Sequence, residues 1–396
     1  MEDKKKYVAG FFGGILCTVV IAGALFFAYV KTQPETVLSD PSHRRKLAYL
    51  ENLIDQYYLE DKEEDELAEG IYTGLIYGLG DPYSAYYTAE EYERESQSTD
   101  GEYTGIGVTI TKNQDKETVI IDCYEGGPAK QAGIQTGDIL KKVNGEAVSG
   151  LELSEVTERI KNSPNDEVVL TIQREGEKNT KEVKVSVTGV EIPSVSSEML
   201  EENIGYIKIS KFTGVTYEQY HAAFEKLKEQ GAKRLIVDLR NNPGGLMTAV
   251  CDVLREILPE GLIVYTEDKY GNRAEETCDG KSPLNMPLVV LVNEGSASAS
   301  EIFAGAVQDH KVGTIVGTTT YGKGIVQTVR QLSDGSAVKL TVSKYYTPNG
   351  NNIHEVGIQP DVEVELSDDI TDLSQVEQSQ DNQLQKALEV VKGKTQ

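Results

Sequence analysis

The stretch PLVVLVNEGSASASEIFAGAVQDH, residues 287–310, decides the fold of this chain. Its branched apolar run at 288–292 predicts a buried β-strand, because a strand covered on both faces shows no polar alternation. The small and polar residues NEGSAS predict a turn, and residues 299–310 predict a helix. The stretch therefore predicts a strand that turns directly into a helix.

The same order recurs on the N-terminal side of this stretch. GYIKIS (205–210) and RLIVDLR (234–240) predict strands, and YEQYHAAFEKLKEQG (217–231) and LMTAVCDVLREIL (246–258) predict the helices that follow them. This alternation is typical of a layered α/β domain. Three β-rich runs lie on the C-terminal side: TIVGT (314–318), IVQTVRQL (325–332) and AVKLTVSKYYT (337–347).

Two strand-to-helix turns carry candidate chemistry. Ser298 lies in the turn at 293–298, beside a helix N-terminus whose free N–H groups favour negative charge. Asn241-Asn242-Pro243-Gly244-Gly245 forms the other turn, and paired glycines let backbone N–H groups approach a ligand closely, as an oxyanion hole requires. Each feature alone also fits a helix cap or a tight loop.

Lys323 stands between two glycines in Tyr321-Gly322-Lys323-Gly324. A lysine acts as a general base only when it is neutral, and burial lowers its pKa from about 10.4 toward the range that suits a base. Gln327 projects to the same face as Lys323 if this stretch is a strand, so its amide can orient the amine. The three features together supply a nucleophile, a base and an oxyanion donor.

Other chemistries find less support. A Ser-His-Asp triad needs a nearby histidine, and His310 lies at the far end of the helix from Ser298, about 18 Å away. The chain has no HExxH, P-loop or dinucleotide fingerprint, and its histidines and cysteines do not cluster, so we expect no metal or cofactor. The formal charge of −25 argues against nucleic-acid binding.

The N-terminus predicts a membrane anchor. Residues 7–30 carry no charge and are long enough to span a bilayer, and lysines 4–6 place residues 1–6 in the cytoplasm. A cleaved signal peptide is the alternative, although its apolar region would be shorter. The anchor predicts a single-pass protein of a bacterial plasma or inner membrane, with the catalytic part extracytoplasmic. Residues 31–42 predict a polar linker.

The remaining boundaries follow from changes in pattern. Residues 43–100 show helical spacing, residues 101–187 predict a compact unit of strands with one clear helix, and residues 188–366 form the α/β core. Residues 367–396 predict an acidic tail with a short helix. Buried free thiols are the expected state of Cys251 and Cys278, with a disulfide between them as the alternative.

The chain resembles the carboxyl-terminal processing peptidases, which combine a crotonase-like (ClpP/crotonase-type) α/β peptidase core with an inserted PDZ domain. GSASASEIFAG resembles the nucleophile segment of that family and YGKGIVQ its general-base segment. The resemblance implies Ser298 as nucleophile in place of Ser296 or Ser300, Lys323 as base and Gln327 as its orienting partner. LRNNPGG resembles the oxyanion strip, which implies donors at the N–H groups of Gly244 and Ala299.

The resemblance extends over residues 45–365. Tyr103-Thr104-Gly105-Ile106-Gly107-Val108 resembles a PDZ carboxylate-binding loop, which implies that Gly105, Ile106, Gly107 and Val108 bind a peptide C-terminus. GGPAKQAGIQTGDILKKVNGE resembles the PDZ core, and GLGDPYSAYYT the segment that precedes this domain in the family.

The family's activity is serine endopeptidase cleavage of proteins near their C-termini, without a cofactor. Its partners would be proteins or peptides with accessible C-termini, the membrane through one N-terminal helix, and further copies of the chain in a homodimer or larger homo-oligomer. Two alternatives remain at this point: another crotonase-like chemistry, such as thioester hydrolysis, and an inactive PDZ scaffold. The first would need a basic coenzyme-binding surface, which an acidic chain does not favour.

Overall fold

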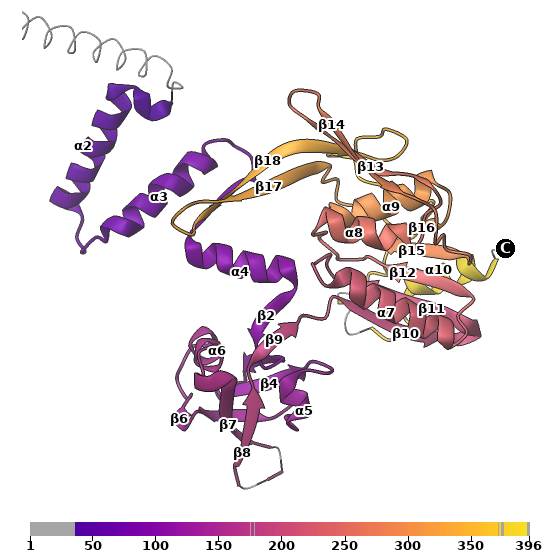
Figure 1. Ribbon diagram of the computed structural model, residues 1–396, viewed down its shortest axis with the longest axis horizontal. Helices are drawn as coiled ribbons and strands as arrows, with labels where there is room; N and C mark the ends of the chain where they lie inside the picture. The colour runs from indigo at the N-terminus through magenta and orange to yellow at the C-terminus, as the bar shows by residue number, and fades with distance from the viewer. Residues whose placement is uncertain (1–35, 175, 178, 371, 374–375, 394–396) are drawn as a thin grey trace, which may run out of the picture. The chain divides into compact units, whose positions relative to one another are not determined.

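A computed structural model describes residues 36–370, 372–373 and 376–393, apart from 175 and 178 (Figure 1). The chain divides into two compact units, Met1–Gly70 and Ile71–Gln396. Within the described residues no helix is both long and apolar enough to cross a membrane. The predicted membrane span, residues 7–30, lies outside the described residues.

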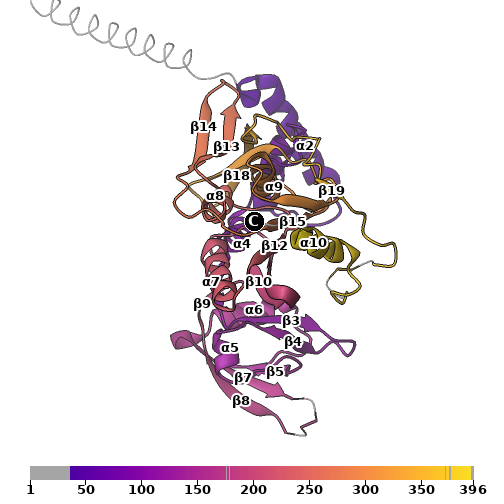
Figure 2. The same ribbon diagram turned by 90° about the vertical axis from the view of Figure 1, so that its right-hand side faces the viewer.

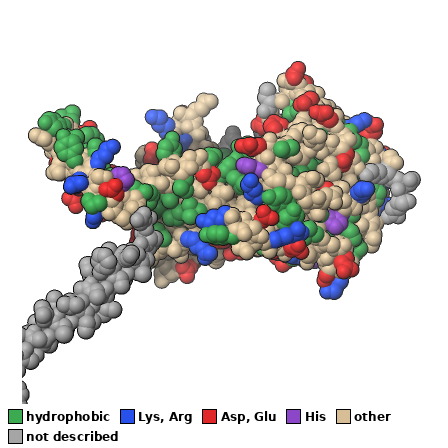
Figure 3. Space-filling view, turned by 90° about the horizontal axis from the view of Figure 1, so that it is seen from above, with side chains coloured by type: hydrophobic (Ala, Val, Ile, Leu, Met, Phe, Trp, Pro, Cys, Tyr) green, Lys and Arg blue, Asp and Glu red, His purple; other side chains and the backbone are tan. Residues whose placement is uncertain are grey.

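The first unit is helical where it is described. It contains the short 3₁₀ turn η1 (Val37–Ser39), helix α2 (Pro41–Tyr57) and the start of α3 (Glu64–Tyr77), which continues into the second unit. Asp40 caps α2 by accepting a hydrogen bond from the Ser42 N–H at 2.7 Å. No residue of α2 is buried, and its hydrophobic side chains appear in green at the left of Figure 3.

The end of the predicted helical segment differs from the expectation. Helix α4 (Ala89–Asp100) is present, but a strand, β1 (Ala85–Tyr87), precedes it. This strand pairs antiparallel with β18 (Ala337–Tyr346) of the core. Its partner lies about 250 residues away in the sequence, so local helical spacing gives no sign of the pairing.

The middle of the chain, residues 102–191, consists mainly of β-strands with one substantial helix. A six-stranded sheet has the order β3-β4-β5-β7-β8, with β6 paired to β5, and α6 packs over it. A separate two-stranded ribbon, β2-β9, borders it. The elements are β2 (Glu102–Gly105), β3 (Val108–Lys112), β4 (Thr118–Cys123), α5 (Pro128–Gln131), β5 (Ile139–Val143), β6 (Glu146–Ala147), α6 (Leu153–Lys161), η2 (Pro164–Asp166), β7 (Glu167–Gln173), β8 (Lys181–Ser186) and β9 (Thr188–Glu191).

The core contains the predicted α/β layer. Its sheet has the order β10-β11-β12-β15-β16-β19, parallel except for β10 at the edge. Helices α7, α8 and α9 lie together on one side of it (Figure 1). The elements are β10 (Val195–Leu200), η3 (Glu201–Asn203), β11 (Ile204–Ile209), α7 (Thr216–Glu229), β12 (Arg234–Asp238), α8 (Met247–Arg255), β15 (Leu288–Val292), α9 (Ala299–Asp309), β16 (Thr314–Gly317) and β19 (Val362–Glu363).

A second, antiparallel sheet completes the core. It joins β1, β18, β13 and β14 in that order, and β17 pairs with β18. Its remaining strands are β13 (Gly261–Asp268), β14 (Arg273–Cys278) and β17 (Ile325–Gln331). Cys251 and Cys278 are buried free thiols, so the disulfide alternative is wrong.

The C-terminal helix belongs to the core and not to a solvated tail. Alternate residues of the parallel sheet face opposite sides, and those that face away from α7–α9, such as Ile236 and Leu291, pack against α10 (Asn382–Gly393) (Figure 2). Leu384, Ala387 and Val391 supply the contact. The helix was predicted, whereas its burial against the sheet was not.

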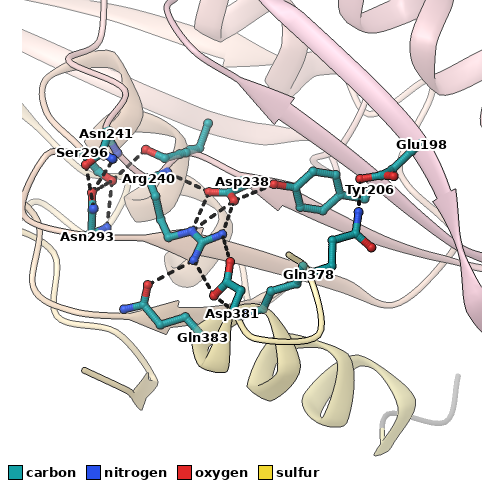
Figure 4. Close-up of polar contacts among 12 residues, drawn as sticks. Glu198, Tyr206, Asp238, Arg240, Asn241, Asn293, Ser296, Gln378, Asp381 and Gln383 are labelled. Carbon is teal, nitrogen blue, oxygen red and sulfur yellow. Dashed lines mark hydrogen bonds and ion pairs between the residues drawn. The ribbon is translucent and has the colours of Figure 1, made fainter. Parts of the chain in front are cut away.

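A buried ion-pair network fastens this helix to β12 (Figure 4). The Arg240 guanidinium donates to Asp238 at 2.6 Å and to Asp381 at 2.8 Å, and its Nη1 also donates to Gln383. The Tyr206 hydroxyl donates to Asp238 as well. Because all of Arg240's donors are directed at acceptors, the charge is buried with its partners in place.

Candidate active site

Ser298 stands at the junction of β15 and α9, where the sequence predicted it. Its backbone has φ of 53° and ψ of −112°, outside the regions that a residue with a Cβ atom normally adopts. Such strain persists only where the surroundings enforce it, and it is common at functional sites. The Tyr345 hydroxyl donates to the Ser298 carbonyl at 3.0 Å and helps to hold the turn.

The three serines of the turn have different environments. Ser296 is fully buried, and its hydroxyl donates to the Leu239 carbonyl at 2.8 Å. Ser300 is also fully buried and donates to the Asn242 carbonyl at 2.9 Å. Ser298 is half-buried, and its hydroxyl donates no hydrogen bond to any described residue; its oxygen faces the Glu301 N–H in a capping box. Ser298 is therefore the serine of this turn whose hydroxyl is available for attack.

Gly244 lies against the nucleophile turn. Its φ is +100°, and a Cβ atom there would come within 2.7 Å of the Ala297 carbonyl oxygen and 2.8 Å of the Ser298 Cβ. Only glycine fits this position. The Gly244 N–H donates to Asn242 Oδ1 at 2.8 Å, whereas the Ala299 N–H has no hydrogen-bond partner among the described residues. Both candidate oxyanion donors therefore lie beside Ser298. The Gly244 N–H is already hydrogen-bonded to Asn242, whereas the Ala299 N–H is not bonded to a described residue.

Lys323 is half-buried in the segment before β17. Its amine is 4.7 Å from the centroid of the Tyr83 ring, which comes from the turn before β1. Burial lowers the pKa of Lys323, and the positive charge of Lys339 lowers it further, while Asp81 and Glu301 act in the opposite direction. This shift has the sign that a lysine base requires.

Gln327 does not contact the lysine in this structure. Its Nε2 donates to the Thr341 Oγ1 at 3.3 Å. No hydrogen bond between described residues joins Lys323 to Gln327 or to Ser298. The expectation of a shared strand face fails because Lys323 precedes β17, which begins at Ile325, so the two-residue period does not extend back to it.

Glu301 connects the turn of Ser298 to the turn of Lys323, and the sequence did not lead us to predict it. This carboxylate is fully buried and accepts four hydrogen bonds, two at each oxygen. Oε2 accepts from the backbone N–H groups of Ser298 and Lys323, each at 2.8 Å. Oε1 accepts from the Gly322 N–H at 2.7 Å and from the Thr320 hydroxyl at 2.6 Å. One side chain therefore fixes the backbone of both the candidate nucleophile and the candidate base.

A signal for Glu301 was present in the sequence. A serine followed three residues later by glutamate, at the start of a helix, is the pattern of a capping box. That pattern predicts the hydrogen bond from the Ser298 N–H to the glutamate. It does not predict the contacts with residues 320–323, which follow β16 and approach only when the sheet has formed.

The PDZ-like loop borders a groove of about 510 Å³. Apolar residues of β2, β3 and α6 line one part of it, and charged residues of α4 line another. The lining residues are Glu90, Glu93, Arg94, Gln97, Tyr103, Thr104, Gly105, Ile106, Val108, Ile110, Ser154, Thr157, Glu158, Ile160 and Lys161. Gly105, Ile106 and Val108 of the predicted loop are among them.

The fold and site define a serine peptidase with a PDZ module, and comparison with known proteins gives its family. Residues 203–364 match the model of peptidase family S41, residues 96–173 that of the PDZ domain, and residues 25–91 that of the activating protease CtpB N-terminal domain. The chain is 33% identical over 363 residues to a Staphylococcus aureus protein described as "Probable CtpA-like serine protease", covering 91% of this chain and 72% of that protein. The chain belongs to peptidase family S41.

A second curated protein and a solved structure are also similar to the chain. The chain is 37% identical over 324 residues to the carboxyl-terminal-processing protease of a Synechocystis strain, covering 81% of this chain and 75% of that protein. An S41 protease structure from Bacteroides fragilis matches 86% of this chain and 92% of its own, with 16% identity and a TM-score of 0.50, which is a likeness of fold. A peptidase family is the assignment, and neither thioester chemistry nor an inactive scaffold is supported.

Proposed function

We propose that this protein is a membrane-anchored endopeptidase that cleaves proteins near their C-termini with a Ser298/Lys323 dyad. The observation that carries the proposal is the Glu301 carboxylate, which joins the backbone of a free serine to that of a lysine whose pKa is lowered by burial. The anchor is proposed from residues 7–30 and the lysines before them, and the core is proposed to be crotonase-like. Gly244 and Ala299 are proposed as the oxyanion donors, and Gln327 is proposed to orient the Lys323 amine.

The proposed reaction is acyl transfer through an ester intermediate. Lys323 takes the proton from Ser298 as the serine oxygen bonds to the scissile carbonyl carbon, and the N–H groups of Gly244 and Ala299 stabilise the oxyanion. The carbon–nitrogen bond then breaks, and Lys323 returns the proton to the leaving amine. A water molecule, deprotonated by Lys323, attacks the ester and releases the carboxylate product and Ser298.

The Lys323 amine has to approach the Ser298 hydroxyl before this reaction begins. The Lys323 amine faces the Tyr83 ring, and a cation over an aromatic face is stabilised in its charged form. Attack therefore requires the lysine to lose its proton and turn toward Ser298, and the Gly244 N–H to leave Asn242 Oδ1 for the substrate oxygen. We propose that substrate binding drives both the movement of Lys323 and the release of the Gly244 N–H. The described arrangement would then be the state of the enzyme without substrate.

The lowered pKa of Lys323 predicts the pH dependence of the rate. The base works only when unprotonated, so kcat/KM should fall about tenfold for each pH unit below that pKa and level off above it. The measurement is the rate of proteolysis between pH 5 and 10, after subtraction of the background rate of the Ser298→Ala variant. Lys339→Gln removes a like charge and should move the profile toward higher pH. A profile that is flat from pH 9 down to 5 contradicts a lysine base.

The PDZ module is proposed to capture the substrate's C-terminus by adding it as a strand beside β3, with its carboxylate on the loop at 105–108. Blocking the carboxylate of a disordered test protein as an amide should therefore reduce cleavage about tenfold or more. The fully matched control is the same protein with a free C-terminus. Equal cleavage of both forms, or unchanged preference after deletion of residues 101–187, would refute capture while leaving the dyad untouched.

A further inference from the structure

The turn at residues 81–84 is fixed by its own hydrogen bonds and by the strand that follows it. Oδ1 of the Asp81 carboxylate accepts from the Tyr83 N–H at 3.0 Å, and Oδ2 accepts from the Ser84 hydroxyl at 2.6 Å. Strand β1 begins directly after the turn and pairs antiparallel with β18. The side chains of Tyr83 and Ser84 therefore project from a backbone that is held against β18.

The turn contacts both parts of the proposed base. The Tyr83 ring lies against the Lys323 amine, whose nitrogen is 4.7 Å from the ring centroid. The Ser84 hydroxyl accepts from the Thr341 N–H at 3.1 Å, and Thr341 Oγ1 accepts from the Gln327 amide at 3.3 Å. One turn thus reaches the lysine directly and the glutamine through a single intervening residue.

The sheet is irregular at the glutamine. The pairing of β17 with β18 shifts by one residue between Val326 and Gln327, which makes Val342 the extra residue of β18. A bulge of this kind redirects the side chains beside it and is frequent next to active sites. A change in the direction of the Gln327 amide therefore does not require a regular ladder to be broken.

We propose that the turn at 81–84 restrains the base in the substrate-free protein. Its tyrosine ring holds the Lys323 amine in the resting position, and its serine, through Thr341, does the same for the Gln327 amide. The inference rests on the proposed role of Lys323 as the general base. It adds positioning residues from a segment that is distant in the sequence from both the nucleophile and the base.

The restraint favours the protonated lysine. A charged amine gains from the face of an aromatic ring and a neutral amine does not, so the ring makes loss of the proton about three- to tenfold less favourable. Besides burial, which lowers the pKa of Lys323, the charged groups that act on it are Lys339, which also lowers it, and Asp81 and Glu301, which raise it. Removal of the ring leaves these three charges in place. It should therefore lower the pKa of Lys323 and increase the neutral fraction at pH 7.

The test measures kcat/KM of the detergent-solubilised full chain on a disordered test protein between pH 5 and 9. Tyr83→Leu removes the aromatic face, so kcat/KM at pH 7 should rise about three- to tenfold, and the midpoint of the pH profile should move about 0.5–1 pH unit lower. Tyr83→Phe keeps the face and should restore the parent values. Tyr87→Leu is the matched control: it removes a ring that lies 5.2 Å from the Lys339 amine, and it should leave the midpoint unchanged.

A second variant tests the contact with the glutamine. Thr341→Val keeps the backbone N–H that donates to Ser84 but removes the hydroxyl that accepts from Gln327. The released amide can then turn toward the lysine, so kcat/KM should rise about two- to tenfold. The gain should vanish when Gln327 is replaced by alanine, because a general effect of Thr341→Val on the sheet would persist in that background.

The ionisation of Lys323 is also measured without catalysis. Acetylation of this lysine by acetic anhydride is followed by mass spectrometry as a function of pH in protein that carries Ser298→Ala. Only the neutral amine reacts, so Tyr83→Leu should move the midpoint of this curve to lower pH as well. This readout does not depend on proteolysis, and it therefore reports on the restraint even where the variant is inactive.

Each result decides the proposal. An unchanged or lower kcat/KM in folded Tyr83→Leu overturns the restraint, and so does an unmoved acetylation midpoint. A Tyr83→Phe variant that behaves like Tyr83→Leu overturns it too, because the aromatic face would not be the cause. If Tyr83→Leu does not fold, Thr341→Val decides, and the absence of a Gln327-dependent gain overturns the proposal. Failure of the dyad itself would show separately, as full activity of Lys323→Ala.

Discussion

Replacement of Ser298 by alanine is expected to lower the rate of proteolysis by about 10⁴-fold or more, because no other serine of the turn has a free hydroxyl. Lys323→Ala should cause a loss of similar size, since the nucleophile and its base act as a unit. The double variant should be no worse than either single one. The measurement is the appearance of new amino termini from a disordered test protein.

The neighbouring serines are the matched controls. Ser300→Ala removes one buried hydrogen bond, and Ser296→Ala removes two, because the Ser296 hydroxyl also accepts from the Asn293 N–H; each lost bond should lower the free energy of unfolding by about 1–3 kcal/mol. They should keep a large part of the activity at temperatures where the protein is folded. If Ser298→Ala stays active while Ser296→Ala or Ser300→Ala is inactive and folded, the assignment of the nucleophile is wrong.

Glu301→Gln is expected to reduce kcat/KM by about 10²–10³-fold. The amide that replaces one carboxylate oxygen cannot accept hydrogen bonds, so two of the four donors directed at residue 301 lose their acceptor. Whichever way the amide points, either the pair Ser298 and Lys323 or the pair Gly322 and Thr320 is left unsatisfied. Unsatisfied buried donors cost about 1–3 kcal/mol each, and the turns would shift relative to each other.

The Glu301→Gln variant can show whether Glu301 positions Ser298 and Lys323 or only stabilises the fold. Kinetics and thermal unfolding should be measured on the same preparations, with the reaction of Ser298 toward a small sulfonyl fluoride as a third readout. Glu294→Gln is the control, because Glu294 lies on the same turn but is exposed and bonds only Thr318, so it should be nearly neutral. Full activity of Glu301→Gln at a lowered melting temperature would contradict the positioning role.

The sequence predicted those parts of the fold that local patterns determine. The strand, turn and helix around Ser298 follow from composition within 24 residues, and the parallel sheet follows from repetition of that unit. Gly244 was predicted as an oxyanion donor by resemblance, and its contact with Ser298 is now described. Its present hydrogen bond to Asn242 could not be predicted, because it depends on how one side chain folds back on its own turn.

The parts that were missed depend on contacts between distant segments. Tyr83 reaches Lys323 because β1 joins the antiparallel sheet, and no periodicity at 85–87 indicates that strand. The segment 43–100 was therefore predicted as a helical segment without a strand. The same reason applies to α10, whose amphipathic pattern predicted a helix but did not identify the sheet face that it covers.

The link between Arg240 and Asp381 has a consequence for how the protein is made. The two residues lie 141 positions apart in the sequence. A growing chain that has not reached residue 381 has Arg240 paired with Asp238 alone, and the apolar sheet face that Leu384 covers is still open. The turn from β12 to Gly244 therefore gains its full set of contacts only after residues 381–391 have been made. Formation of the candidate oxyanion turn is thus coupled to a segment that is synthesised much later than the turn itself.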